Sequence, residues 1–472
     1  MFKKYFKIIS SIAIITLCFF VLAGCGSTKD DNKLRIIVRN AGYGESWIRV
    51  LETKFESDHP EIDVDITALY DANTLINSHL ESSKNQDDLY ISIGADWKSY
   101  AAQGYFASLD DLLDDEVDGV TVKDKVAKEY QGSLYFTKSN GTSTCYRLPW
   151  TSGIGGIYYN KAMFEEHGWK VPTTFDELIT LCKTINDAKI AVAGDRKTAV
   201  KPFAYTGANT DDFDYAVYGW WGQIVGVDAI NEYLKYESAS NYDVTKNPTF
   251  AALKTATNYW KQLFVSEDGT GESAYVISGS KSKTAENAQK EFANGYAAMM
   301  FNGDWLYNEI LNYGIQNDKF ELGLMKTPLI PEAKYDNTSY VIGEDQFIVI
   351  PKTSKKQDLA KEFIKLMISN EGCLTFTKEA NGFLAYNTDF SNNEITDEFV
   401  KESIVLRETY TNRFTNYSPN RKYLCNYIDV WCTSALRPYL GLLNGTTTLD
   451  NSFNVIATTA SANWADWTER AS

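Results

Sequence analysis

The chain has 472 residues, of which 44% are hydrophobic and 14% aromatic, and it carries a formal net charge of −16. This length and aromatic content exclude a disordered chain and allow more than one substantial hydrophobic core. The 46 Lys and Arg are spread along the sequence, so the basic patch that a nucleic-acid partner requires is missing. Three histidines leave little room for His-based metal or general-base chemistry, and we expect neither a metal nor a cofactor.

Residues 1–24 have the pattern of a secretory signal. Lysines up to Lys7 precede an apolar run over 8–21, and Leu-Ala-Gly closes the segment before Cys25. This ending is similar to the lipobox of bacterial lipoproteins, in which the cysteine is acylated and becomes the mature N-terminus. The alternative is an uncleaved transmembrane anchor, although the apolar run is shorter than the ~20 residues that a span needs.

The lipobox resemblance implies lipid attachment at Cys25, a polar tether over 25–33 and a body held outside the bacterial cell membrane. Removal of three lysines with the signal changes the net charge from −16 to −19. The five cysteines that remain beyond Cys25 contain no Cys-x-x-Cys pair, which favours buried free thiols and leaves their disulfide state open. They are Cys145, Cys182, Cys373, Cys425 and Cys432.

Strand and helix patterns alternate in the first part of the body. The predicted elements, in chain order, are a strand over 34–39, a helix over 45–59, a strand over 62–66, a helix over 72–83 and a strand over 89–93. This order predicts a parallel α/β sheet, and ligands bind at the carboxyl ends of such strands. The loops at those ends are 40–44, 70–73 and 94–97.

Further signals continue along the chain. The acidic run 110–118 favours a solvated helix face over a calcium loop, because it lacks the alternation and glycine of an EF-hand. Thr174 and Glu177 form a predicted capping box. Later predicted elements are helices over 250–264 and 286–294, strands over 295–301 and 340–350, and a helix over 359–369, followed by a mostly helical tail.

Four motifs then occur in order. They are Pro149-Trp150 with Gly156-Ile-Tyr-Tyr-Asn-Lys161 and Pro172-Thr-Thr-Phe-Asp-Glu-Leu178; Phe292 to Met299 with Gly303-Asp-Trp305; Ile350-Pro-Lys with Ala360-Lys-Glu-Phe-Ile364 and Glu371-Gly372; and Asn381-Gly-Phe-Leu-Ala385. Together they resemble the bacterial ABC-transporter extracellular solute-binding proteins of family 1, the carbohydrate-binding class that includes maltose-binding proteins. The resemblance covers about residues 34–386.

This resemblance implies an α/β fold of two lobes, each a mostly parallel sheet flanked by helices, with a ligand cleft between them. The implied crossings lie near Trp150, Asn302 and Gly372. The amino-terminal lobe would then comprise 31–150 and 302–371, and the carboxyl-terminal lobe 151–301 and 372–472. It further implies a monomeric receptor that closes around a carbohydrate and delivers it to the transmembrane subunits of an ABC permease.

A sugar has apolar C–H faces and a polar rim, so it is recognised by flat aromatic rings and by planar carboxylates, amides and Arg. The candidate ligand-binding residues are Tyr43, Asp96, Trp97, Trp150, Trp220, Trp221, Asp304, Trp305, Glu344, Asp345 and Trp431. Packing in a core is the alternative role for each Trp, and helix capping is the alternative for Asp96 and Asp304. Only one of the adjacent Trp220 and Trp221 is expected to face the cleft.

No nucleophile or acid–base pair stands out, so we expect no catalytic residue and no enzymatic activity. Two other functions stay open. A secreted glycoside hydrolase would need two carboxylates ~5–9.5 Å apart, which 62 acidic residues in a linear sequence do not exclude. A receptor of the same fold for a non-sugar solute, such as a polyamine or a peptide, is the third possibility.

Overall fold

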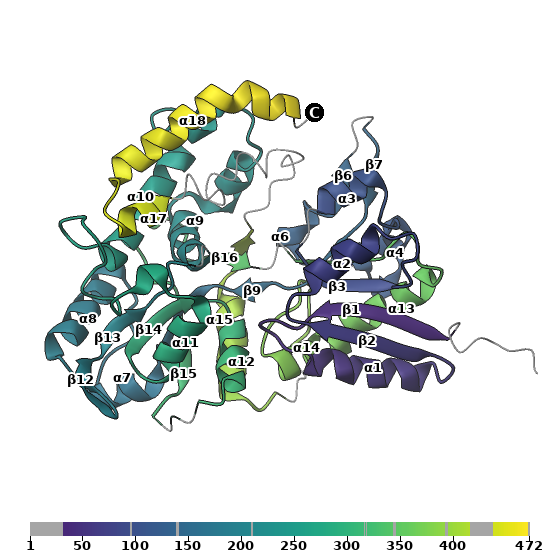
Figure 1. Ribbon diagram of the computed structural model, residues 1–472, viewed down its shortest axis with the longest axis horizontal. Coiled ribbons are helices and arrows are strands. Elements are labelled where there is room, and N and C mark those ends of the chain that lie inside the picture. Colours follow the sequence, from purple (N-terminus) through teal and green to yellow (C-terminus); the bar gives the residue numbers. More distant parts are fainter. Residues whose placement is uncertain are drawn as a thin grey trace, which may run out of the picture.

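Two mixed β-sheets, each covered by helices, form two lobes that lie side by side along the longest axis of the computed structural model (Figure 1). The structure describes residues 32–94, 97–137, 141–208, 211–315, 317, 319–342, 346–391, 395–415 and 438–470. The predicted signal, Cys25 and most of the predicted tether lie outside these residues. Among the described residues, no helix combines the length and apolar composition needed to cross a bilayer.

The amino-terminal lobe is built on a sheet with the strand order β2-β1-β3-β17-β8. Its strands are β1 (Lys33–Arg39), β2 (Asp63–Leu69), β3 (Leu89–Ile93), β8 (Leu148–Pro149) and β17 (Phe347–Val349). The first three strands are parallel and are linked by α1 (Ser46–Asp58) and α2 (Ala72–Leu80), which confirms the predicted opening units. Because β17 joins antiparallel to both β3 and β8, the sheet is mixed.

The carboxyl-terminal lobe contains a sheet with the order β13-β14-β10-β15. Its strands are β10 (Gly156–Asn160), β13 (Lys201–Ala204), β14 (Ala297–Asn302) and β15 (Leu322–Met325). Every residue of β14 is buried, as expected for a central strand with helices on both faces. Only β13 and β14 run parallel among these pairs, so this sheet is mixed as well, and not mostly parallel as the resemblance implied.

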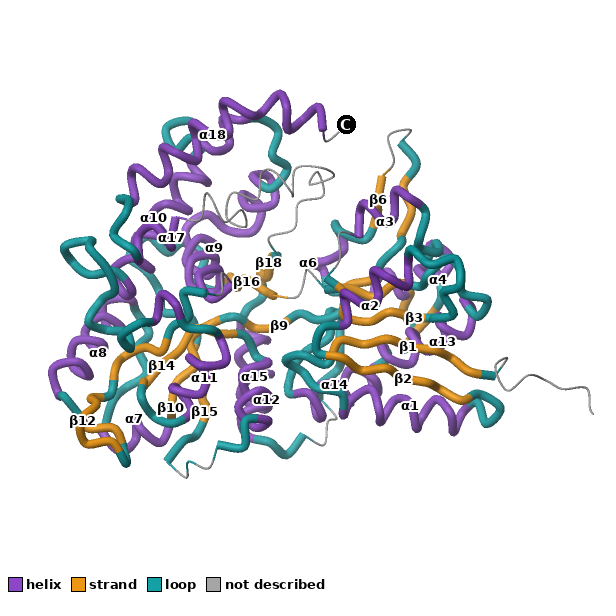
Figure 2. Tube along the Cα trace, viewed as in Figure 1, coloured by secondary structure: helices purple, strands orange, loops and turns teal. Residues whose placement is uncertain are grey.

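The remaining elements complete both lobes (Figure 2). The amino-terminal lobe adds α3 (Trp97–Gln103), α4 (Asp110–Asp114), β4 (Glu116–Val117), β5 (Val120–Thr121), α5 (Val122–Lys125), α6 (Lys128–Gln131), β6 (Tyr135–Thr137), β7 (Ser143–Cys145), α13 (Gln357–Ile368) and α14 (Asn370–Ala380). The carboxyl-terminal lobe adds α7 (Lys161–His167), α8 (Phe175–Ala188), β11 (Ala191–Val192), β12 (Asp195–Ala199), α9 (Asp211–Tyr233, with a break at Gly226), η1 (Ala239–Tyr242), α10 (Pro248–Phe264), η2 (Ser280–Ser282), α11 (Ala285–Ala293), α12 (Trp305–Asn312), α15 (Glu398–Thr409), α17 (Pro438–Leu443) and α18 (Leu449–Arg470).

The start of α8 shows how local sequence specifies an element. The Thr174 hydroxyl accepts the Glu177 backbone N–H, and the Glu177 carboxylate accepts the Thr174 N–H. This pair confirms the predicted capping box and satisfies backbone donors that the first turn leaves free. From this start, Leu178, Cys182 and Ile185 follow at helical spacing and are fully buried.

Within the part of the chain that the structure describes, three connections link elements of different lobes. The first runs from β8 through β9 (Gly153–Ile154) to β10, the second from β16 (Thr338–Ile342) to β17, and the third follows Tyr386 and precedes α15. β9 pairs with β16, which in turn pairs with β18 (Asn412–Phe414), and β9 passes between the lobes in Figure 2. A bridge between Thr151 and Leu384 ties the first segment to residues just before the third. The connections are therefore bonded to one another.

Two of the implied crossing points differ from the observed ones. After Asn302 the chain forms α12 and then β15, which pairs with β10 in the carboxyl-terminal sheet. Residues 302–342 thus belong with that lobe. Beyond Gly372, Phe376 is part of the amino-terminal core together with Tyr386. The motifs mark strand–turn–helix units, but the sheet that the next strand joins depends on pairing partners far away in the sequence.

The described cysteines confirm the expected free thiols. Cys145, Cys182 and Cys373 are buried and unpaired. Burial raises the pKa of Cys145 to about 12 and that of Cys373 to about 11, which keeps both as inert thiols. Cys425 and Cys432 lie outside the described residues.

The acidic run 110–118 forms the short helix α4 and then enters the β4–β5 hairpin, and three of its acids form ion pairs. Asp115 contacts Lys365 at 3.0 Å, and Asp111 contacts Lys361. Asp118 contacts the buried Lys125 at 2.7 Å. These ion pairs therefore hold residues 110–118 against α13 and α5 of the same lobe.

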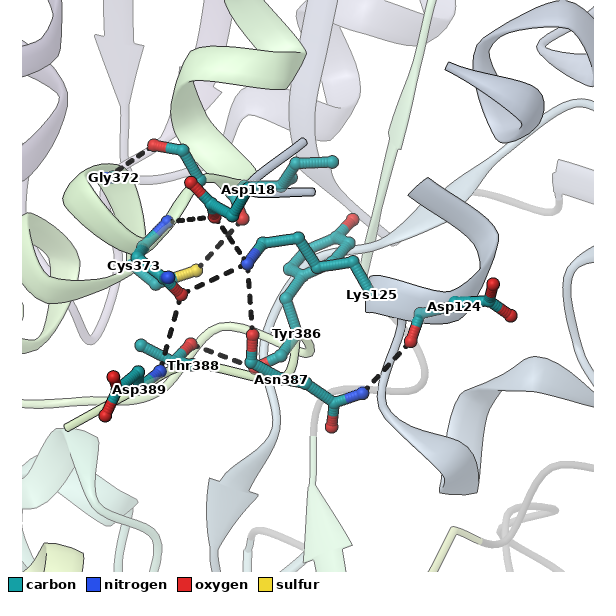
Figure 3. A network of polar contacts seen from close by, with 12 residues as sticks. Asp118, Asp124, Lys125, Gly372, Cys373, Tyr386, Asn387, Thr388 and Asp389 are labelled. Carbon is teal, nitrogen blue, oxygen red and sulfur yellow. Dashed lines mark hydrogen bonds and ion pairs between the residues drawn. The ribbon is translucent and has the colours of Figure 1, made fainter. Parts of the chain in front are cut away.

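Lys125 is the centre of a polar network that holds the third connection to the amino-terminal lobe (Figure 3). Its side chain is 3% exposed. The ammonium group also donates to Asn370 Oδ1 at 3.1 Å and to the Asn387 carbonyl at 3.2 Å. Asp118 in turn accepts the Asn370 backbone N–H at 2.7 Å. One buried cation thus joins α5, the start of α14 and the segment after Tyr386.

We predict that Lys125→Met lowers the free energy of unfolding by about 2 kcal/mol, because it leaves a partly buried carboxylate and a carbonyl without their cation. Urea denaturation followed by circular dichroism measures this change. The matched control is Lys33→Met, which removes a more exposed ion pair with Asp63 at 3.2 Å and is expected to cause no measurable loss. Equal effects of the two substitutions would contradict the prediction.

Candidate functional site at the lobe junction

The loop 40–44 after β1 meets α12 of the other lobe. The Asn308 side chain donates to the Gly42 carbonyl at 2.8 Å, and the Tyr43 hydroxyl donates to Asp304 Oδ1 at 2.6 Å. This is one of the loops at the carboxyl ends of the parallel strands where the sequence predicts ligand contacts. The two lobes therefore touch where a ligand-binding loop was expected.

Trp305 begins α12 and lies at this meeting point. Its half-buried indole packs against the hydrophobic cores of both lobes. Its ring makes edge-to-face contacts with Tyr43 and Tyr215, at centroid distances of 6.2 and 5.8 Å. A Cβ at Gly303 would stand 2.4 Å from the Trp305 ring, so only glycine leaves space for this orientation. The surroundings thus hold the indole in one place.

Tyr43 belongs to a compact aromatic group. Its ring lies 5.5 Å from that of Trp150 and 5.1 Å from that of Phe376, and Trp47 contacts both of these rings. Trp150 is 1% exposed. The structure therefore brings the predicted Tyr43, Trp150, Asp304 and Trp305 together, but it packs Trp150 beneath the junction.

Asp304 is fully buried at the end of β14. It stands at the N-cap position of α12 without making a side-chain capping bond, so the capping alternative does not describe it. Burial raises the pKa of its carboxyl group to about 6, while the Tyr43 hydroxyl, the Ile154 N–H and the Arg407 charge pull that pKa down. The Asp304 carboxyl group therefore loses its proton near pH 6, about two pH units above an ordinary aspartate.

A second polar group lies on the first connection. The Glu129 side chain, 3% exposed on α6, accepts from Arg413 Nε of β18 at 2.8 Å. Ser152 Oγ donates to the same Glu129 oxygen at 3.3 Å. The buried Arg407 of α15 donates to the Ser152 carbonyl at 2.8 Å. This group joins the lobes through charged contacts, in addition to the Tyr43–Asp304 bond.

Sequence reasoning missed this second group, and it missed Glu309 on α12. Glu309 accepts from the buried Gln289 side chain at 2.7 Å, and burial raises its pKa to about 7 while Arg39 of the other lobe lowers it. No motif marks these residues. Glu129 and Arg413 are 284 positions apart in the chain, so only the fold makes them neighbours.

The other predicted residues lie elsewhere. Trp97 is 7% exposed, and the Arg147 guanidinium covers its ring at 4.3 Å from the centroid. Trp220 and Trp221 are 0% and 1% exposed, and their indole N–H groups donate to the carbonyls of Pro328 and Thr249. Neither of the two presents a ring face at the junction. Asp96, Glu344, Asp345 and Trp431 are outside the described residues.

We predict that Asp304→Asn flattens the pH dependence of stability between about pH 4 and pH 6. The folded-state pKa of about 6 lies above the ordinary value of 3.8, so the folded protein binds more protons in this window. The unfolding free energy of the wild type therefore falls as pH rises, by up to about 3 kcal/mol from this group.

Urea denaturation at pH 4, 5, 6 and 7 measures the difference between variant and wild type. Asp389→Asn is the control, because hydrogen bonds from Ser391 lower the pKa of this exposed carboxyl group, which is the opposite direction to Asp304. A wild-type slope in Asp304→Asn would show that the buried carboxyl group does not titrate as expected.

Comparison with known proteins agrees with this architecture. Residues 40–372 match the family model described as bacterial extracellular solute-binding protein. The multiple sugar-binding protein of Streptococcus mutans is 26% identical over 381 residues, which cover 77% of this chain and 79% of that protein. The diacetylchitobiose binding protein DasA of Streptomyces coelicolor is 25% identical, covering 80% and 81%.

The fold is similar to that of the GacH receptor of Streptomyces glaucescens, which was solved without ligand and with acarbose. The TM-score is 0.67 at 20% sequence identity, with 92% of this chain and 98% of that chain covered. The family consists of non-catalytic receptors, which decides against the glycoside hydrolase alternative. The family model covers well over half of the sequence and confirms the resemblance read from the four motifs, so the chain belongs to the bacterial extracellular solute-binding proteins.

Proposed function

We propose that this receptor captures an oligosaccharide between its two lobes by hinge closure and delivers it to a membrane permease of the ABC type. The observation that carries the proposal is Trp305, a half-buried indole held at the place where the lobes meet. The names of the relatives support a sugar, since they describe binding of multiple sugars and of diacetylchitobiose.

The chemistry of Trp305 suits a pyranose ring. A flat indole covers the apolar C–H face of a sugar. The entropy cost of fixing the Trp305 indole on binding is small, because Gly303, Tyr43 and Tyr215 already hold it in place. The other predicted tryptophans within the described residues are at most 7% exposed. Trp305 is therefore the aromatic platform that we favour.

Hinge closure fits the three connections. Lobes linked by short, laterally bonded segments can rotate about those segments while each core stays intact. The facing surfaces of the two lobes would then approach a ligand from opposite sides. The ligand, once enclosed, would lose contact with water on both faces of its ring.

The proposed location and partners follow from the amino-terminal segment and from the family. Cys25 would carry the lipid after removal of residues 1–24, and the tether would hold a monomeric receptor on the outer face of the cell membrane. There the receptor would meet the transmembrane subunits of its permease. Mass spectrometry of the membrane-bound protein would show the lipid on Cys25, whereas an intact residue 1–24 segment would contradict this part of the proposal.

We predict that Trp305→Ala weakens sugar affinity by ~1–3 kcal/mol, as expected for an aromatic anchor at the centre of a binding site. Isothermal titration calorimetry with diacetylchitobiose, raffinose or acarbose, chosen by thermal-shift screening, measures the loss. Trp169→Ala is the matched control, since Trp169 is also half-buried but packs beside Phe164 within one lobe. Unchanged affinity in Trp305→Ala would remove this residue from the site.

The same screening tests the solute class. A sugar that binds the folded protein raises the unfolding temperature, and the stabilisation grows with the logarithm of ligand concentration over the dissociation constant. A response to polyamines or peptides with none to sugars would replace the carbohydrate by a charged solute. Release of reducing ends at enzyme-like rates would overturn the receptor function.

A further inference from the structure

The bond between Tyr43 and Asp304 joins the two lobes through buried groups. Its length is 2.6 Å, and the two residues are 5% and 0% exposed. The partners are 261 positions apart, one on the loop after β1 and one at the end of β14. Side chains that are this deeply buried and that bond one another are poorly placed to meet a sugar hydroxyl directly.

The same bond lies against the first connection between the lobes. A Cβ on Gly153 of β9 would stand 2.8 Å from Asp304 Oδ1 and 3.1 Å from the Tyr43 hydroxyl oxygen. Because Gly153 has no side chain, the Tyr43 hydroxyl and the Asp304 carboxylate can pack directly against the backbone of the first connection. The bond therefore lies beside a connection about which the lobes would rotate in the proposed hinge closure.

Trp305 depends on both partners of the bond. It follows Asp304 directly in the chain, and its ring contacts the Tyr43 ring edge-to-face at 6.2 Å. The Gly42 backbone also stands close to it, since a Cβ there would be 3.2 Å from Trp305 Cβ. The indole is thus set by the placement of the loop 40–44 relative to α12, which are parts of different lobes.

We propose that Tyr43 and Asp304 are positioning residues whose interlobe hydrogen bond holds Trp305 in its sugar-binding orientation and links that orientation to the relative placement of the lobes. The proposal rests on the proposed function as far as the sugar is concerned. It assigns both residues a role other than the direct ligand contact expected from the sequence.

The electrostatics provide a readout of the bond. The ionisable groups that act on Asp304 are Tyr43 on the loop, Tyr158 on β10 and Arg407 on α15. Because the Tyr43 hydroxyl donates to the carboxyl group, it lowers the Asp304 pKa, which burial has raised to about 6. Loss of that hydroxyl therefore moves the titration of Asp304 to higher pH.

The experiment compares Tyr43→Phe with Tyr90→Phe in the full-length protein labelled with 5-fluorotryptophan. Tyr90 is an equally buried tyrosine whose hydroxyl donates to Asp87 at 2.8 Å inside one lobe, so it is a matched control. Trp305→Phe identifies the Trp305 resonance by its disappearance. The fluorine spectrum is recorded from pH 5 to pH 8, and affinity for the sugar found by screening is measured for each variant.

Three results are expected from this comparison. In Tyr43→Phe, the Trp305 resonance shifts and its titration midpoint moves above the wild-type value. The sugar dissociation constant rises by about 3–10-fold, which corresponds to one lost hydrogen bond. In Tyr90→Phe, the resonance, its midpoint and the dissociation constant stay as in the wild type, although both variants unfold at a lower temperature.

A Trp305 resonance that behaves alike in the two variants would overturn the proposal, as would equal losses of affinity. If Tyr43→Phe fails to fold, Asp304→Asn decides instead, because it keeps an acceptor but should abolish the titration of the Trp305 resonance. If the wild type binds no sugar, the proposed function fails, while the fluorine spectra of the ligand-free variants still decide the positioning role.

Discussion

The first connection between the lobes imposes the constraint on which the rest of the structure depends. Residues 150–154 pass from one core to the other through a buried region, where each backbone polar group needs a partner. The Ser152 N–H donates to the Phe383 carbonyl at 2.9 Å, and the Ser152 carbonyl accepts from Arg407. Satisfying the polar groups of this short segment brings residues of both lobes together, among them Phe383, which lies shortly before the third connection.

The contacts around this segment differ in character. Tyr43 and Asp304 form a short bond between neutral or weakly acidic groups, whereas Glu129 and Arg413 form an ion pair in which the carboxylate is buried and the guanidinium is partly exposed. Buried charges are costly unless they are paired and hydrogen-bonded, so such groups specify one arrangement more than they add stability. In the hinge closure that we propose, contacts of this kind beside the connections would keep the two lobes in a defined relation.

Much of the local structure was predictable from sequence. The alternation of apolar runs and amphipathic stretches predicted β1 to β3 with their helices, and Thr174 with Glu177 predicted the start of α8. Tyr43, Asp304 and Trp305 were named from loop positions and a motif. The predictions of these elements succeeded because they rest on interactions within a few residues of the chain, whereas the ligand-binding roles of Tyr43, Asp304 and Trp305 stay predictions. Burial of Trp220 and Trp221 was not predictable, since their partners Pro328 and Thr249 come from distant segments.

The sequence by itself determined the family, the α/β class and the aromatic and acidic residues available for a site, because periodicity and motifs are properties of neighbouring residues. Only the tertiary structure decided that β15 joins the sheet of β10 and that the chain crosses after Ile342 and after Tyr386. It also decided that Asp304 bonds Tyr43 inside the junction and that Trp305 stays half-buried there. Strand pairing and burial bring together residues more than 250 positions apart, and only the packed fold specifies those distances.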